Sequence, residues 1–214
     1  MRYNFLPSFA RRKGRITKLQ EKNLSFLADY SLKHPNTLND NPSFDKIALE
    51  IGFGNGEDFF SFAKEKNNTL FLASEVYKSG IGNLIGKIRE HSLKNICIHE
   101  GDIRDLIFEE EGFRFDEVYI ICPDPWPKDR HHKRRLLNKE FFARIQACLK
   151  PNSLLFLSTD WKNYAEHIQD VLRDFEDKFS VETIKQIPGR EFSKFQKKGI
   201  DEGREIYSFK LSLI

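Results

Sequence analysis

The sequence has no apolar run long enough to span a bilayer, and its first 24 residues carry too many charges to resemble a signal peptide. Its three cysteines, at positions 97, 122 and 148, do not have the spacing of a metal site or of a disulfide framework. Internal repeats and low-complexity tracts are absent as well. We therefore expect a cytoplasmic protein with reduced thiols, no bound metal and no association with a membrane.

Hydrophobic residues make up 39% of the 214-residue chain and include 20 phenylalanines, which is typical of one well-packed globular domain. The net charge is only +3, but the charges are segregated. Residues 1–22 carry seven basic side chains and one acidic, and residues 128–140 carry six and two. Residues 101–117 carry seven acidic side chains and two basic. This distribution indicates a basic surface that binds a polyanion.

From residue 47 onward, short apolar runs alternate with amphipathic segments. Strands are expected at 47–51, 70–74, 95–99, 118–122, 153–158, 179–187 and 205–213, and helices at 57–64, 79–91, 103–108, 138–149 and 161–175. A basic loop is expected at 188–199. The alternation predicts an α/β fold, a doubly wound open sheet of about seven strands. Residues 1–42 are expected to form a basic arm, a helix from Thr17 to about Leu32 and a turn-rich linker, with the main domain at 43–214.

Three glycines follow the first strand in a G-x-G-x-G pattern: Gly52, Gly54 and Gly56. A strand, a glycine-rich turn and a helix N-terminus predict a nucleotide-type site, because glycine lets the backbone approach the ligand. The spacing differs from G-x-G-x-x-G, so a dinucleotide is not indicated. Glu75 ends the second strand about 20 residues later, where it can accept hydrogen bonds from ribose hydroxyls. Asp102 ends the third strand and is expected to face an adenine amino group, to cap the next helix, or both.

The segment Cys122-Pro123-Asp124-Pro125-Trp126-Pro127-Lys128 follows the fourth strand. Each proline fixes its φ angle and lacks a backbone donor, so the segment predicts a stiff loop at the edge where open α/β sheets bind ligands. The loop presents one carboxylate, Asp124, and one indole, Trp126, which either stacks on a base or packs against the prolines. Cations that we expect to contact phosphates lie at Lys128, Arg130, Lys133, Arg134 and Arg135, and near the N-terminus at Arg11, Arg12 and Arg15.

With an acid after the second strand, the glycine pattern makes the chain similar to class I S-adenosylmethionine-dependent methyltransferases. Three stretches resemble one family of that class, the bacterial tRNA (guanine-N7-)-methyltransferases: residues 11–20, the PDPWPK motif with its following cations at 123–135, and the tail at 193–206. The resemblance covers nearly the whole chain. It implies that the 43–214 domain methylates guanine 46 in the variable loop of tRNA, with S-adenosylmethionine as the methyl donor.

The resemblance also implies roles for single residues. Positions that match Glu50, Glu75, Asp102 and Asp124 contact the methyl donor, and the one that matches Asp124 is catalytic. Positions that match Lys128, Asp160, Ser193, Lys194, Phe195 and Gln196 contact the substrate. The family's last tetrad usually starts with Thr and ends with Glu, so a charge-dependent role is in doubt for Gln196. Asp160 is also explained locally, as the N-cap of the helix that follows it.

Guanine N7 carries an in-plane lone pair and no proton, so its attack on a sulfonium methyl group needs no general base. We expect catalysis from in-line placement and electrostatics, with Asp124 stabilising the charge that the guanine gains. Two alternatives stay open: another S-adenosylmethionine-dependent methyltransferase, acting on RNA or a small molecule, and a non-catalytic RNA-binding protein with the same fold. The sequence favours neither a monomer nor a homodimer.

Overall fold

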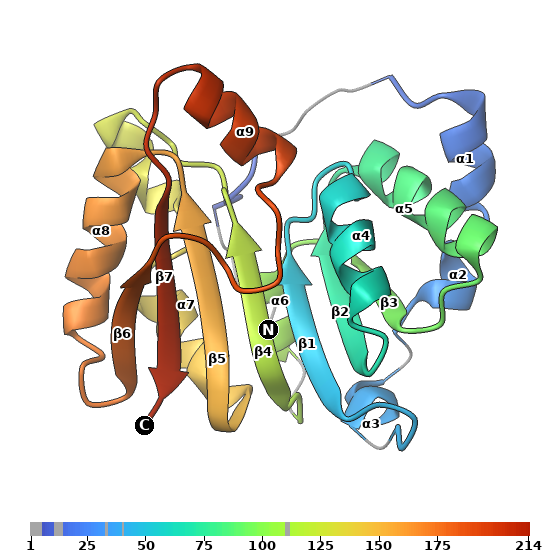
Figure 1. The fold of residues 1–214 in the computed structure, drawn as a ribbon, viewed down its shortest axis with the longest axis horizontal. Coiled ribbons are helices and arrows are strands. Elements are labelled where there is room, and N and C mark those ends of the chain that lie inside the picture. The colour runs from blue at the N-terminus through green and yellow to red at the C-terminus, as the bar shows by residue number, and fades with distance from the viewer. Residues whose placement is uncertain (1–5, 11–14, 33, 40, 110–111) are drawn as a thin grey trace.

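The structure, a computed structural model, describes residues 6–10, 15–32, 34–39, 41–109 and 112–214. Within these residues, seven strands form one sheet in the order β3-β2-β1-β4-β5-β7-β6 (Figure 1). The strands are β1 (Lys46–Ile51), β2 (Thr69–Glu75), β3 (Ile96–Glu100), β4 (Phe115–Ile121), β5 (Leu149–Thr159), β6 (Phe179–Ile184) and β7 (Tyr207–Leu213). Strands β1 to β5 pair in parallel, whereas β7 is antiparallel to β5 and β6. The predicted doubly wound α/β sheet is confirmed.

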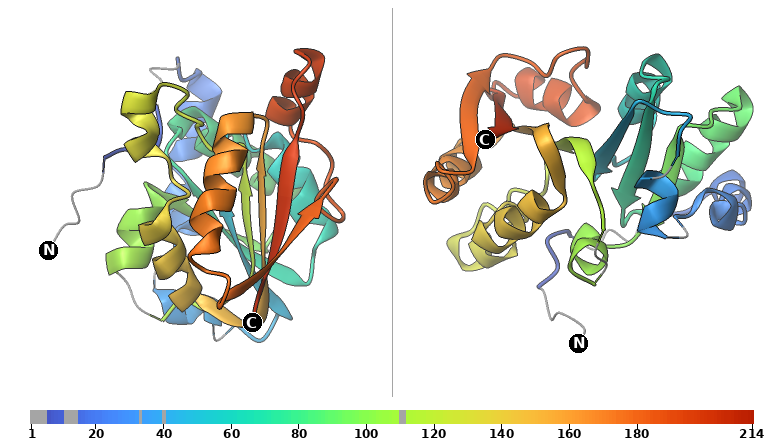
Figure 2. Two further views of the ribbon diagram at one scale, coloured as in Figure 1. Left: turned by 90° about the vertical axis from the view of Figure 1, so that its left-hand side faces the viewer. Right: turned by 90° about the horizontal axis from the view of Figure 1, so that it is seen from below.

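Helices cover both faces of the sheet (Figure 2). They are α1 (Lys18–Leu24), α2 (Leu27–Tyr30), α3 (Pro35–Asn39), α4 (Glu57–Glu65), α5 (Lys78–His91), α6 (Ile103–Glu109), α7 (Lys139–Ala147), α8 (Lys162–Arg173) and α9 (Lys194–Asp201). Side chains of α4 and α5 pack on one face with Ala48 and Phe71, and side chains of α6, α7 and α8 pack on the other with Leu49 and Val118. Both faces are covered, which explains the uninterrupted apolar strands. No helix in the described ranges is long and apolar enough to cross a membrane.

The helix predicted from Thr17 to about Leu32 is divided into α1 and α2. Thr17 caps α1 as expected: its side chain accepts the N–H of Gln20, and the Gln20 side chain accepts the N–H of Thr17. α1 packs against α5, where a Cβ at Gly82 would lie 2.6 Å from the backbone oxygen of Gln20. The missing side chain at Gly82 therefore allows α1 to dock. The domain boundary after residue 42 stays a prediction.

Helices replace two segments that were expected to be irregular. The linker contains α3, and the loop expected at 188–199 contains most of α9. In α9, the Ser193 side chain accepts the N–H of Gln196, and the Gln196 side chain accepts the N–H of Ser193. This is a second capping box, so the helix start was encoded in the sequence. β5 begins at Leu149, four residues before the strand expected at 153–158.

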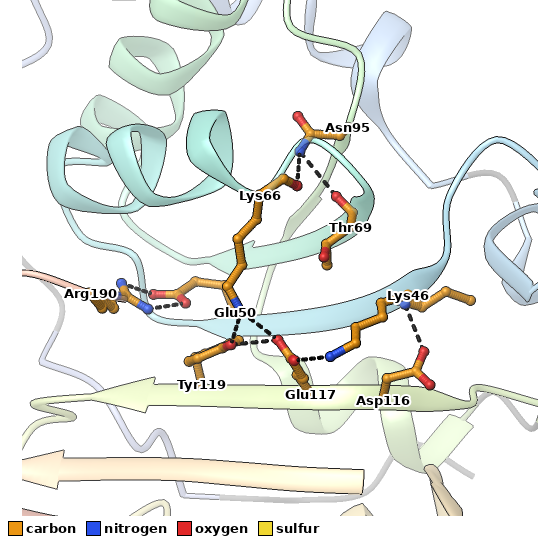
Figure 3. Close-up of polar contacts among 10 residues, drawn as sticks. Lys46, Glu50, Lys66, Thr69, Asn95, Asp116, Glu117, Tyr119 and Arg190 are labelled. Carbon is orange, nitrogen blue, oxygen red and sulfur yellow. Dashed lines mark hydrogen bonds and ion pairs between the residues drawn. The ribbon is translucent and has the colours of Figure 1, made fainter. Parts of the chain in front are cut away.

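A buried polar network joins β1, β4 and the end of α4 (Figure 3). Glu117 accepts hydrogen bonds from Lys46 at 2.7 Å, from Lys66 at 2.9 Å and from Tyr119 at 2.6 Å. Burial alone raises the pKa of the Glu117 carboxyl, but the three donors outweigh it and bring the pKa to about 2. The carboxylate is therefore strongly held as an anion, and it links strands of the central sheet.

Candidate functional site

A cavity of about 600 Å³ opens at the carboxyl edge of the parallel strands. The predicted site residues that line it are Gly52, Gly54, Glu75, Asp102, Asp124, Asp160 and Phe195. Four of these are acids that follow or end different strands, and parallel strands bring such positions to the same edge. Apolar side chains such as Ile51, Ile103 and Leu136 complete the lining. The cavity thus combines apolar surface with converging carboxylates.

Glu75 holds the glycine-rich turn in place. Its Oε2 accepts the N–H of Gly54 at 2.6 Å, and its Oε1 accepts the N–H groups of Val76 and Tyr77 at 2.7 and 3.0 Å. Burial raises the pKa of this carboxyl, while the backbone donors act in the opposite direction. A Cβ at Gly80 would lie 1.8 Å from the backbone oxygen of Gly54, so only glycine lets α5 approach the turn this closely.

Asp102 forms an ion pair with Arg104 beside the cavity. Its Oδ2 lies 2.6 Å from Nη2 of Arg104, and its Oδ1 accepts hydrogen bonds from Nε and from the backbone N–H, both at 3.0 Å. The backbone contact is the one expected of an N-cap, and the residue lines the cavity at the same time. Nη2 of Arg104 also donates to the carbonyl of Leu6 at 2.9 Å, which fastens the N-terminal segment to this wall.

The proline loop, residues 122–128, contains two backbone bends. Cys122 has a φ angle of 48° and Trp126 one of 46°, a conformation that is strained for residues other than glycine and that occurs often at functional sites. Between the bends, Asp124 lines the cavity, and its Oδ2 accepts the N–H of Ala10 at 2.7 Å. The Trp126 indole donates to the carbonyl of Ser8 at 2.9 Å, which ties the loop to the N-terminal segment, and base stacking by Trp126 stays a prediction.

The expectation that Asp160 caps the following helix is wrong. Trp161 occupies the N-cap position of α8, and its N–H donates to Oγ1 of Thr159 at 3.2 Å. Oδ2 of Asp160 instead accepts a hydrogen bond from Nε of Arg204 at 2.9 Å, and both residues line the cavity. Arg204 was absent from the predicted site, although it belongs to the tail that carries the family resemblance. A Cβ at Gly199 would lie 2.8 Å from the Asp160 carboxylate, so α9 packs closely against it.

Residues 193–196, expected to contact the substrate, form the first turn of α9, where two of them are committed to the protein. Gln196 accepts the Ser193 N–H at 2.8 Å and donates from Nε2 to Oγ of Ser158 at 3.1 Å, and it is 4% exposed. The amide makes both contacts with its oxygen as acceptor and its nitrogen as donor, whereas a carboxylate here would need the Ser158 hydroxyl to be the donor. Ser193 and Gln196 therefore position α9, whereas Lys194 is exposed and Phe195 is 45% exposed, and substrate contact by these two residues stays a prediction.

The residues that were predicted to contact phosphates differ in how exposed their side chains are. Exposed side chains lie at Arg15, Lys128, Arg130 and Lys133, and Arg134 is partly buried beside the Trp126 ring, while Arg11 and Arg12 lie outside the described residues. The expectation for Arg135 is wrong, because its side chain is 1% exposed and donates to the Pro125 carbonyl and to Asn163. A fully buried guanidinium cannot reach a phosphate on the surface.

Glu50, expected to contact the methyl donor, lies inside β1 and outside the cavity lining. Its two carboxylate oxygens accept hydrogen bonds from Nη1 and Nη2 of Arg190, each at 2.7 Å (Figure 3). The Glu50 side chain is 1% exposed and the Arg190 side chain 5%. The structure thus commits this carboxylate to Arg190, and the pair links β1 to the segment that precedes α9. Gly56, another expected donor contact, is the N-cap of α4, also outside the lining.

Comparison with known proteins identifies the family. A family model described as "Putative methyltransferase" matches residues 45–209. The tRNA (guanine-N(7)-)-methyltransferase of Nitrosococcus oceani is 36% identical over 211 residues, which cover 96% of this chain and 89% of that protein. The enzyme of the same name from Alkalilimnicola ehrlichii is 34% identical, with 94% and 90% covered. The chain belongs to the tRNA (guanine-N(7)-)-methyltransferase family.

Solved structures share the fold of this tRNA (guanine-N(7)-)-methyltransferase family member. The precorrin-6y C5,15-methyltransferase of Geobacter metallireducens superimposes with a TM-score of 0.56 at 16% identity, over 95% of this chain and 92% of that one. A putative methyltransferase from Streptococcus mutans in complex with SAH gives a TM-score of 0.51 at 12% identity, over 94% and 100%. At such identities the likeness shows the fold alone.

Proposed function

We propose that the protein transfers the methyl group of S-adenosylmethionine to N7 of guanine 46 in the variable loop of tRNA. The observation that carries the proposal is the convergence of Glu75, Asp102 and Asp124 on one cavity, beside a loop that continues into exposed cations. Membership of a family whose curated relatives are named for tRNA guanine-N7 methylation supports the same reaction.

The cavity residues fit S-adenosylmethionine, which supplies a methyl group on a positively charged sulfonium when bound. Each carboxylate oxygen accepts up to two hydrogen bonds, so Oε2 of Glu75 can accept a ribose hydroxyl in addition to the Gly54 N–H. Asp102 and Ile103 are neighbours in the cavity lining. Asp102 can accept a hydrogen bond from the adenine amino group, while the Ile103 side chain packs on the adenine ring. A volume of about 600 Å³ also suits a ligand of this size.

Asp124 acts by charge and not by taking a proton. As N7 bonds to the methyl carbon, the carbon–sulfur bond breaks, its electron pair stays on sulfur, and the guanine becomes a cation. A carboxylate at Asp124 stabilises that developing charge. Its Oδ2 receives the N–H of Ala10 at 2.7 Å, and this contact orients the carboxylate before the substrate arrives.

On the side of the cavity that would receive the guanine, Asp160 and Phe195 belong to the lining. Lys128, at the end of the proline loop, and Arg130 and Lys133, just beyond it, are exposed. We assign guanine contacts to Asp160 and Phe195 and phosphate contacts to the cations. Each neutralised phosphate makes binding more sensitive to salt. The alternative of a non-catalytic RNA-binding protein requires no acid at position 124, whereas methyl transfer does.

Asp124→Ala tests the proposal. We expect kcat for methyl transfer to fall by about 10²-fold or more, as when a group that stabilises transition-state charge is removed, while tRNA affinity is retained. Asp129→Ala is the matched control, because that acid is fully exposed five residues further along the same cationic segment. Filter binding and transfer of labelled methyl groups measure the two quantities. Equal loss of tRNA binding and transfer in Asp124→Ala would mean that the residue only shapes the turn.

A further inference from the structure

Arg135 is a fully buried cation in a basic segment whose other cations are exposed or partly buried. Among the completely buried side chains of the described residues, that of Arg135 is the largest, and it is 1% exposed. Arg130 and Lys133 in the same segment are exposed. Removing a guanidinium from water is costly unless its donors are satisfied. A charge retained at such a cost points to a specific task, and the contacts of Arg135 define that task.

Its planar guanidinium joins two separate segments. Nε donates to the carbonyl of Pro125 at 3.0 Å, and Nη2 donates to Oδ1 of Asn163 at 2.6 Å. The guanidinium carbon lies 4.9 Å from the centre of the Tyr164 ring, within range of a cation–π contact. Both hydrogen-bond acceptors are neutral, so these contacts depend on the geometry of the donors and not on the pairing of opposite charges.

Each of the joined segments carries an acid of the site. Pro125 follows Asp124 directly in the proline loop, and Asn163 lies in the first turn of α8, just after Asp160. The main chain beyond Arg135 is fixed to α8 as well, because Oη of Tyr164 accepts the N–H of Leu137 at 3.1 Å. A shift of the Pro125 carbonyl would therefore move the Asp124 carboxylate relative to Asp160.

We propose that Arg135 is a positioning residue for methyl transfer, which fixes Asp124 relative to Asp160 by holding the Pro125 carbonyl and Asn163. The inference rests on the proposed function, since it needs Asp124 to act beside the reacting atoms. Lysine cannot replace arginine here, because an ammonium group lacks the planar fork that spans the two acceptors. Misplacement of a catalytic group by about 1 Å costs about 10²-fold in rate.

The experiment compares Arg135→Lys with Arg130→Ala, using the full chain, unmodified tRNA and S-adenosylmethionine. For Arg135→Lys we expect kcat to fall by about 10²-fold, with the KM for tRNA and the salt dependence of tRNA binding unchanged. For Arg130→Ala we expect a different pattern: weaker tRNA binding and a slope of log affinity against log salt that is smaller by about 1, as for a lost phosphate contact.

A second pair of variants keeps the test valid if Arg135→Lys does not fold. Asn163→Ala removes one acceptor and is expected to lower kcat by about tenfold, the equivalent of about 1.4 kcal/mol. Asn163→Asp keeps an oxygen at that position and is expected to restore kcat. Three results would overturn the inference: a folded Arg135→Lys with normal kcat, a smaller salt slope in Arg135→Lys, or equal loss of kcat in Asn163→Ala and Asn163→Asp. Failure of the proposed function is distinguishable, because the wild-type chain would then form no 7-methylguanosine.

Discussion

Replacing Arg190 by methionine tests whether Glu50 serves the architecture or the methyl donor. The substitution removes two hydrogen bonds of 2.7 Å and leaves a carboxylate that is 1% exposed without its partner. Breaking a buried ion pair from one side costs about 3–5 kcal/mol, because the remaining charge stays out of water. In a chain of this length each kcal/mol lowers Tm by about 2–4 °C, so we expect Arg190→Met to lower Tm by about 6–20 °C.

The double variant Glu50→Leu/Arg190→Met is the control, since it removes both charges and fills their volume with apolar groups. Such replacements are often neutral, so most of the lost stability should return. The segment before α9 then lacks its tether to β1, and tRNA affinity should fall. Affinity for S-adenosylhomocysteine should be unchanged, because Glu50 lies outside the cavity lining.

Thermal unfolding and calorimetric titration measure both effects. The reasoning would be refuted if the folded double variant bound S-adenosylhomocysteine more than about tenfold more weakly, a loss of about 1.4 kcal/mol. That result would place the Glu50 carboxylate in contact with the methyl donor, as the family resemblance implied. A double variant as unstable as Arg190→Met would contradict the account of the pair as two mutually compensated charges.

Two further predictions concern the glycine turn and the buried network. Gly80→Ala places a Cβ 1.8 Å from the Gly54 backbone oxygen. We therefore expect the free energy of unfolding to fall by about 1–3 kcal/mol and the methyl donor to bind more weakly. Unchanged affinity for the methyl donor would show that the turn tolerates a shift. Glu117 has a folded-state pKa of about 2, below its unfolded value, so its stabilisation is present above about pH 4.5 and is lost as the pH falls toward 2. Glu117→Gln should therefore lower the unfolding free energy at pH 7 by about 2 kcal/mol and have little effect near pH 2, which denaturant titrations at both pH values measure. A pH-independent difference would contradict the assignment.

The sequence predicted the acids of the cavity because each one is marked by its own neighbours. Glu75, Asp102 and Asp124 follow or end apolar runs that can only be buried strands, and parallel strands deliver their carboxyl ends to one edge. The capping box of α9 was also visible in the sequence, as a serine followed three residues later by glutamine. It was overlooked because the basic, aromatic composition of that stretch suggested a loop.

The partners of buried charges could not be predicted in the same way. Glu50 and Arg190 are 140 residues apart, and a charge in a strand gives no indication of which cation will meet it. Arg135 stands among other cations, and only the fold shows that it turns inward. The contact between Ala10 and Asp124 joins residues 114 positions apart, in a segment without any hydrophobic period. These features depend on tertiary packing and not on local pattern.

Methylation of tRNA by the purified chain tests the central claim most directly. Unmodified tRNA is incubated with the protein and methyl-labelled S-adenosylmethionine, then digested to nucleosides and separated by chromatography. The account predicts label in 7-methylguanosine, and none when guanosine 46 of the transcript is replaced by adenosine. The absence of labelled 7-methylguanosine, or its persistence in the substituted transcript, would contradict it.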